Sequence, residues 1–157
     1  MTAIPSMPNW TAAQRHRIEQ IAASYAARTG RALVAPSADP AAALWTAPMA
    51  IVAHGTEPDP VFFFGNDTAL RLFEMSFAAF TRLPSRLSAE PLARDERARL
   101  LDRVTRLGII EDYAGIRISA TGRRFHIANA AVWNLTDAHG HPAGQAAAFA
   151  DWHPVDV

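Results

Sequence analysis

The sequence predicts an α+β domain whose core is a single antiparallel sheet of about five strands. Three observations point to this class: two short apolar runs before residue 65, helical periodicity in the middle of the chain, and a period of two residues in its last third. We expect short helices on one face of the sheet and an amphipathic helix ahead of it. The length of 157 residues fits one domain.

The first part of the chain is expected to precede the sheet. Residues 1–8 carry two prolines and predict a mobile lead-in. Residues 9–47 predict an N-terminal helical extension, in which a capping box begins a helix at Thr11 and Gly30 is a stop signal. A second, weaker helix is predicted at 39–45, where a proline suits the first turn.

The helix that begins at Thr11 carries a narrow apolar stripe. Ile18, Ile21 and Tyr25 recur on it at helical spacing. Such a stripe either covers the helix's own domain or pairs with a second copy of the chain, and both interpretations stay open here. The second one predicts a homodimer with these three residues in its interface.

Residues 48–153 are expected to form the main domain, which opens with two strands. Apolar runs at Pro48–Ala53 and Pro60–Phe64 end in glycine-containing turns and predict neighbouring strands. Asn66 or Asp67 can then cap a short helix, because both side chains accept hydrogen bonds from backbone N–H groups.

The second half of this domain is expected to be helix and then sheet. A short helix is predicted at 76–81 and a longer one, amphipathic and ended by a glycine, at Pro91–Leu107. The period then changes to two, which predicts strands at Tyr113–Ser119, Arg123–Leu135 and Ala143–Trp152, joined by turns.

Composition excludes several kinds of chemistry. All 15 basic residues are arginine, and the chain has neither Lys nor Cys. Thiol nucleophiles, disulfides, thiolate zinc sites and lysine Schiff bases are therefore excluded. The formal net charge of zero supplies no long-range attraction to nucleic acid or anionic membranes. Because no signal peptide or long apolar run is visible, we expect a soluble, cytoplasmic protein without nucleic-acid or membrane partners.

Four long segments carry a family resemblance: VAHGTEPDPVFFFGNDTALRLFEMS, LPSRLSAEPLARDERARLLDRV, YAGIRISATGRRFHIANAAVWNL and GQAAAFADW. Through them the chain from about Met49 to Trp152 resembles the MEKHLA domain, a branch of the PAS-like sensor fold. This domain is found in small bacterial proteins and at the C-terminus of some plant homeodomain transcription factors. The resemblance implies a PAS-like MEKHLA domain over 48–153 and a role in sensing or interaction, with no catalysis expected.

The resemblance also implies what such a domain can bind. Related families commonly hold a small organic molecule between helices and sheet, or form homodimers. If this domain signals, we expect a partner protein to receive the signal. Covalent light sensing needs a Cys that this chain lacks. Haem in this fold usually takes an axial His from the helix before the last three strands, and Pro91–Leu107 has none, so haem is not expected. A noncovalent flavin, stacked on Trp133 or on Phe side chains, stays open, and the cofactor is otherwise unknown.

A sheet wrapped by short helices can enclose a pocket, and seven residues are candidates for its lining. On a regularly alternating strand Arg123–Leu135, one face would carry Phe125, Asn129 and Trp133. Asn129 would then be a polar group that needs a partner. The candidates are Phe64, Asn66, Phe73, Tyr113, Phe125, Asn129 and Trp133. The same aromatic residues also suit a filled core, and the alternative function is therefore a pure protein-interaction module.

Two clusters of polar residues are candidates for binding sites. Asp137, His139 and His141 have a spacing that suits a metal, but these residue types also form turns, and we expect a turn and no metal. Arg117 with Arg123 or Arg124 suits an anion site. The structural alternative is a set of ion pairs with nearby carboxylates, namely Glu90, Glu111 and Asp112.

A small enzyme on an α+β scaffold is the third hypothesis. The chain has no GxSxG motif, and SxxK is impossible without Lys. His126 is the side chain to watch for acid–base chemistry, and two titratable groups in one cleft would favour this hypothesis.

Overall fold

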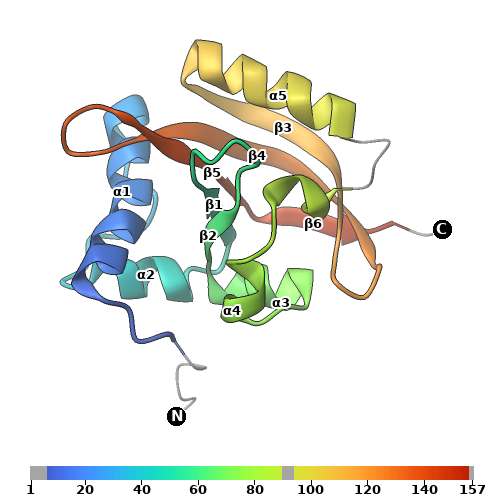
Figure 1. Cartoon of the computed structure of the whole chain (residues 1–157), viewed down its shortest axis with the longest axis horizontal. Helices are drawn as coiled ribbons and strands as arrows, with labels where there is room; N and C mark the ends of the chain where they lie inside the picture. The colour runs from blue at the N-terminus through green and yellow to red at the C-terminus, as the bar shows by residue number, and fades with distance from the viewer. Residues whose placement is uncertain (1–6, 90–93, 156–157) are drawn as a thin grey trace.

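The computed structural model describes residues 7–89 and 94–155. It contains one antiparallel sheet with the strand order β2-β1-β5-β4-β3, and a further strand, β6, pairs with β4 (Figure 1). The strands are β1 (Ala50–His54), β2 (Phe62–Gly65), β3 (Ile109–Ile118), β4 (Arg124–Thr136), β5 (Pro142–Phe149) and β6 (Asp151–Pro154). The helices are α1 (Ala12–Thr29), α2 (Pro40–Thr46), α3 (Asp67–Phe73), α4 (Phe77–Phe80), the 3-10 helix η1 (Ser85–Ser88) and α5 (Arg94–Leu107).

This architecture confirms the predicted α+β class and corrects the sheet in two places. The segment predicted as one last strand is two strands, β5 and β6, which run along β4 in one continuous register from Ala148 opposite Ala131 to Asp151 opposite Ala128. β3 begins four residues earlier than predicted, because Gly108 at φ 87° ends α5 and leads straight into it. Residues 1–6 of the predicted lead-in, and Pro91 as the predicted start of α5, lie outside the described residues.

α1 lies on one face of the sheet, across β4. Its predicted capping box is present, with Thr11 and Gln14 bonded reciprocally, and Gly30 ends the helix at φ 71°. Ile18 and Ile21 are 2% and 0% exposed, in the core that α1 shares with the sheet. The stripe therefore covers the helix's own domain, and these two side chains are not free to meet a second copy.

α3 and α5 cover the opposite face of the sheet, and α4 lies beside β2 (Figure 1). Phe73 of α3 contacts Phe125 of β4, with ring centres 5.2 Å apart. Phe80 of α4 stacks on Phe62 of β2 at 4.2 Å. Val104 of α5 packs in a small cluster with residues of β3 and β4. The sheet thus separates α1 from α3 and α5, which contribute to the candidate site.

A bulge at Asn129 changes which face the β4 side chains occupy. Tyr113 pairs with Ala130 but Gly115 pairs with Ile127, so β4 has one extra residue between these pairs. Asn129 occupies the left-handed region at φ 54°. The expectation that Trp133 shares a face with Phe125 is wrong, because the extra residue turns every later side chain to the other face.

Candidate functional site

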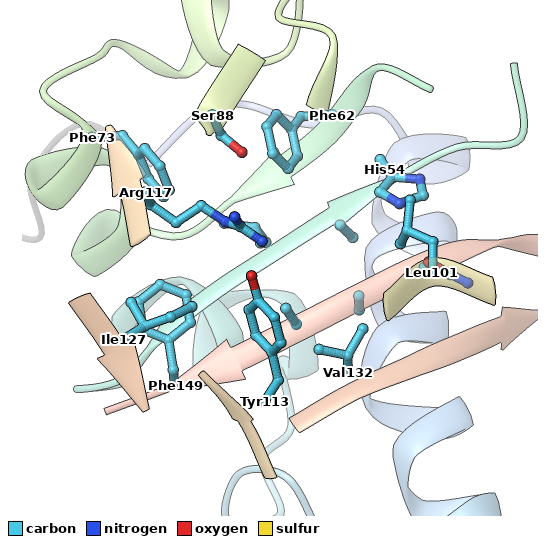
Figure 2. Close-up of a pocket in the computed structure, with 15 residues that line it drawn as sticks. His54, Phe62, Phe73, Ser88, Leu101, Tyr113, Arg117, Ile127, Val132 and Phe149 are labelled. Atoms are coloured by element: carbon cyan, nitrogen blue, oxygen red, sulfur yellow. The ribbon is translucent and has the colours of Figure 1, made fainter. Parts of the chain in front are cut away.

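A cavity of about 60 Å³ lies between the sheet and helices α3 and α5. Its walls are mainly apolar and come from β1, β2, β4, β5 and α3: Val52, Phe62, Phe73, Ile127, Val132 and Phe149. Figure 2 shows these side chains around a centre into which Arg117 and Tyr113 point from β3. The position matches the one expected for a pocket, but the volume lies well below the roughly 300 Å³ at which small-molecule sites ordinarily begin.

This volume tests whether the cavity can hold a noncovalent flavin, the cofactor that the sequence left open. A flavin carries three fused rings, which need a site in the ordinary size range for cofactors. With the side chains placed as they are, a cavity of about 60 Å³ does not hold that ring system. Trp133, one of the residues expected to stack on it, lies on the other face of the sheet, where its ring is 5.0 Å from Tyr25 of α1.

Arg117 supplies the charge in the cavity. It pairs with Phe125 across β3 and β4, so its side chain lies on the cavity face, and the residue is 9% exposed. Its Nη1 donates to the carbonyl oxygen of Ile116 at 3.3 Å. Within residues 7–89 and 94–155 no carboxylate lies within ion-pair distance of its guanidinium. A guanidinium has five N–H donors, so most of its hydrogen-bonding capacity is unused.

Tyr113 lies beside this arginine. The Arg117 Cζ atom is 5.2 Å from the centre of the Tyr113 ring, which is a cation–π distance. Gly115, between them on β3, makes room for the tyrosine, since a Cβ atom there would lie 2.3 Å from Tyr113 Oη. The alternation of β3 places all three residues on one face. The cavity therefore has a positive group with an aromatic hydroxyl next to it.

Gln145 supplies a second polar group. It pairs with His54 across β5 and β1, and His54 lies away from Phe73 in the cavity (Figure 2). Gln145 is 9% exposed, and its Nε2 donates to Asn134 Oδ1 at 2.9 Å. Its Oε1 atom is buried and accepts no hydrogen bond from the described part of the chain. A donor on a bound molecule would complete it.

The seven candidate pocket residues divide between the cavity and the core. Phe73 and Tyr113 line the cavity, and Phe125 packs against Phe73 without lining it. Phe64 is completely buried beside Trp10, with ring centres 6.0 Å apart. Asn129 is exposed and donates from Nδ2 to Asp151 at 3.2 Å.

Asn66 is buried in a structural role. Its Oδ1 accepts the backbone N–H groups of Ile51 and Ala69, both at 3.0 Å. Its Nδ2 donates to the carbonyl oxygens of Leu44 and Met49, at 3.0 and 2.8 Å. All four hydrogen-bonding positions of the amide are used. The side chain joins α2, β1 and α3 and has nothing left to offer a ligand.

Sequence reasoning missed Arg117 and Gln145 as cavity residues. For Arg117 a signal was present, because Tyr113, Gly115 and Arg117 alternate along one strand and Tyr113 was already a candidate. The ion pairs expected for Arg117 are formed by other residues. Glu111 pairs with Arg31, and Asp112 pairs with Arg103 at 3.2 Å. The third expected partner, Glu90, lies outside the described residues.

The 137–141 segment is a turn, as the sequence predicts. Asp137 Oδ1 accepts the backbone N–H groups of His141 and His139, at 2.9 and 2.8 Å. These bonds, that of His141 first, hold the pKa of the Asp137 carboxyl below its ordinary value. Among residues 7–89 and 94–155 no three potential metal ligands come together.

His126, the residue considered for acid–base chemistry, lies away from the cavity. It pairs with Ile116 on the face opposite Phe125 and Ile127. Its neighbour across β4 and β6 is His153, with ring centres 5.1 Å apart. The cavity and this histidine pair are therefore separate places on the sheet.

Known structures share this fold. A PAS domain of a protein from Colwellia psychrerythraea matches with a TM-score of 0.59 at 14% identity, over 73% of this chain and 92% of that one. An RNA-binding light-oxygen-voltage receptor gives 0.57 at 16%, over 74% and 31%. A LOV protein of Rhodobacter sphaeroides gives 0.57 at 12%, over 88% and 66%. At these identities the likeness shows the fold alone.

The sequence comparisons narrow the assignment. Among curated proteins no relative matches the chain. In the described part of the chain no helix combines the length and apolar character needed to cross a membrane. A sequence model of the MEKHLA domain matches residues 15–154, from α1 to the end of β6. Given this match and the PAS-type order of the sheet, the chain belongs to the MEKHLA domain family, a PAS-like family.

Proposed function

We propose that the chain is a sensory module that binds a small organic molecule noncovalently in the cavity between the sheet and α3 and α5. The observation that carries this proposal is the buried guanidinium of Arg117, which has no carboxylate partner among residues 7–89 and 94–155, at an otherwise mainly apolar cavity. Ligand sites combine apolar walls with a few converging polar groups, and this cavity has that composition on a small scale.

Occupancy of the cavity can change the opposite face of the sheet through β4. Val132 lines the cavity, and the next residue, Trp133, donates from Nε1 to the carbonyl oxygen of Ile21 in α1 at 3.1 Å. A ligand that shifts this part of β4 would change how α1 sits on the sheet. The size of the response is limited by the difference in affinity for the two arrangements. A partner protein that contacts α1 would read it.

Native mass spectrometry of freshly purified protein, followed by thermal unfolding with a panel of small acids, alcohols and amides, tests the proposal. A bound mass, or a compound that raises the unfolding midpoint in a saturable way, is the expected result. Protein at its apoprotein mass of 17.1 kDa that no compound stabilises would contradict it.

The second candidate function is a protein-interaction module with a filled core, and the small cavity volume is the observation that favours it. Such a module needs a contact surface, and Leu107 at the end of α5 is 61% exposed. If the module forms a homodimer, we propose this exposed apolar side chain for its interface. Light scattering would report twice the mass of one chain, and Leu107→Ser would return it to one.

A further inference from the structure

We propose that the ligand is a short organic acid whose carboxylate binds the guanidinium of Arg117. This inference rests on the proposed function, because it names the chemical class that the same cavity accepts. Two features of the cavity carry it: a buried guanidinium with no carboxylate partner among residues 7–89 and 94–155, and a small, mainly apolar volume.

The charge comes first. An arginine side chain stays protonated at any physiological pH, so burial cannot be relieved by loss of the proton. Burying such a cation without an anion is strongly unfavourable. In the described part of the chain, Arg117 makes one long hydrogen bond to the carbonyl oxygen of Ile116 and contacts the Tyr113 ring, and neither group carries a negative charge. A carboxylate matches the fork of the guanidinium with two parallel hydrogen bonds.

The size and lining of the cavity limit the rest of the molecule. A volume of about 60 Å³ admits few non-hydrogen atoms beyond the carboxylate. The walls next to Arg117 in Figure 2, Ile127, Phe73 and Phe149, are apolar and favour a short hydrocarbon group over an inorganic anion. A long fatty acid is excluded by the same volume.

The test is isothermal titration of the full chain with four probes: L-lactate, propionate, lactamide and inorganic phosphate. Lactamide keeps the shape and hydroxyl of lactate but has no charge. Lactate and propionate are both expected to bind, and lactamide is expected to bind at least about tenfold more weakly than lactate, since it offers only a neutral partner to the guanidinium. Phosphate is expected to bind weakly, because it has no apolar part.

Arg117→Met tests whether the guanidinium binds the carboxylate. Arg82→Met is the matched control, because it removes the same charge from an exposed position. Arg117→Met should abolish the preference for lactate over lactamide and raise the unfolding midpoint of the ligand-free protein, because it removes an unpaired buried cation. An arginine with a purely structural role would lower that midpoint. Arg117→Lys, which keeps the charge without the fork, should retain weaker binding and serves if the Met variant does not fold.

Each of the other possible results would contradict a specific part of the proposal. Equal binding of lactate and lactamide would support a small-molecule site but contradict the claim that its ligand is an anion. Phosphate binding as tight as that of lactate would overturn the organic acid in favour of an inorganic ion. A ligand that copurifies and carries no acidic group would overturn the acid but support the site. No binding of any probe to protein at its apoprotein mass would overturn both this inference and the proposed function.

Discussion

The guanidinium of Arg117 lies 5.2 Å from the ring centre of Tyr113, and both side chains enter the same cavity from β3 (Figure 2). The contact depends on Gly115, whose missing side chain leaves space for the tyrosine ring. A cation over an aromatic face is held in one orientation by the ring's quadrupole. The aromatic ring therefore orients the arginine without neutralising it, which leaves its donors free for a ligand.

Gly115→Ala should disturb this pair. The new Cβ would lie 2.3 Å from Tyr113 Oη, and Gly115 does not occupy the left-handed region, so the effect comes from the tyrosine alone. Overpacking of this kind costs about 1–3 kcal/mol of the free energy of unfolding, which urea denaturation measures. Tyr113→Phe removes the nearest clashing atom, so the double variant should lose less than the sum of the two single variants. Additive losses would show that the ring does not occupy this space.

Asn66→Ala should destabilise the fold more than any exposed asparagine. The variant leaves two backbone N–H groups and two carbonyl oxygens without their partners in a site that is 0% exposed. Because each unsatisfied buried group costs about 1–3 kcal/mol, we expect a loss of at least about 3 kcal/mol in urea denaturation. Asn9→Ala, at an exposed position, is the control and should change stability by less than about 0.5 kcal/mol. A similarly small loss of stability for both variants would contradict the role of Asn66 in joining α2, β1 and α3.

The sequence predicted the order of the elements well and the faces of β4 poorly, and Asn129 is the reason. Period and turn residues locate strands, but a bulge of one residue leaves the composition of a strand unchanged while it reverses every later side chain. Trp133 was therefore assigned to the cavity although it packs on α1. Arg117 was considered for an anion site with Arg123 or Arg124 but not as a cavity residue, because whether its guanidinium meets a carboxylate depends on packing between distant segments.

Asn129 variants should report the bulge. A φ of 54° is unfavourable for residues with a Cβ atom, although less so for asparagine than for the others. Glycine adopts this φ without a steric cost. Asn129→Gly should be within about 0.5 kcal/mol of the parent, Asn129→Ala lower by about 1 kcal/mol, and Asn129→Val lower still. The side chain is exposed, so packing does not confuse the comparison. Equal urea midpoints for Gly and Val would mean that β4 does not keep the positive φ.

Ile21→Ala should destabilise the chain without changing its mass in light scattering. Ile21 is 0% exposed in the core between α1 and the sheet, so truncation leaves a cavity and costs about 2–5 kcal/mol. Ala22→Ser, the next residue and partly exposed, is the control and should have a much smaller effect. A change from dimer to monomer with little loss of stability would restore the dimer interpretation of the α1 stripe.

Glu74 should make stability depend on pH below neutrality. Its Oε2 atom accepts the hydroxyls of Thr121 and of Ser119, the latter at 2.7 Å, and Arg123 lies 3.6 Å from its Oε1. These contacts, that of Thr121 first, lower the pKa of the Glu74 carboxyl below its ordinary value. They tie the end of α3 to the turn between β3 and β4.

A carboxyl whose pKa is lower in the folded state than in the unfolded state stabilises the fold above the unfolded pKa, which is about 4.3 for Glu. That contribution is lost as the pH falls through the lower, folded pKa. Glu74→Gln keeps a similar side chain at φ 59° but cannot ionise. The variant should therefore be less stable than the parent at pH 7, and the difference should shrink as urea denaturation is repeated down to about pH 3. Glu96→Gln on the exposed side of α5 should show no such convergence, and a constant gap for Glu74→Gln would mean that its charge does not hold the turn.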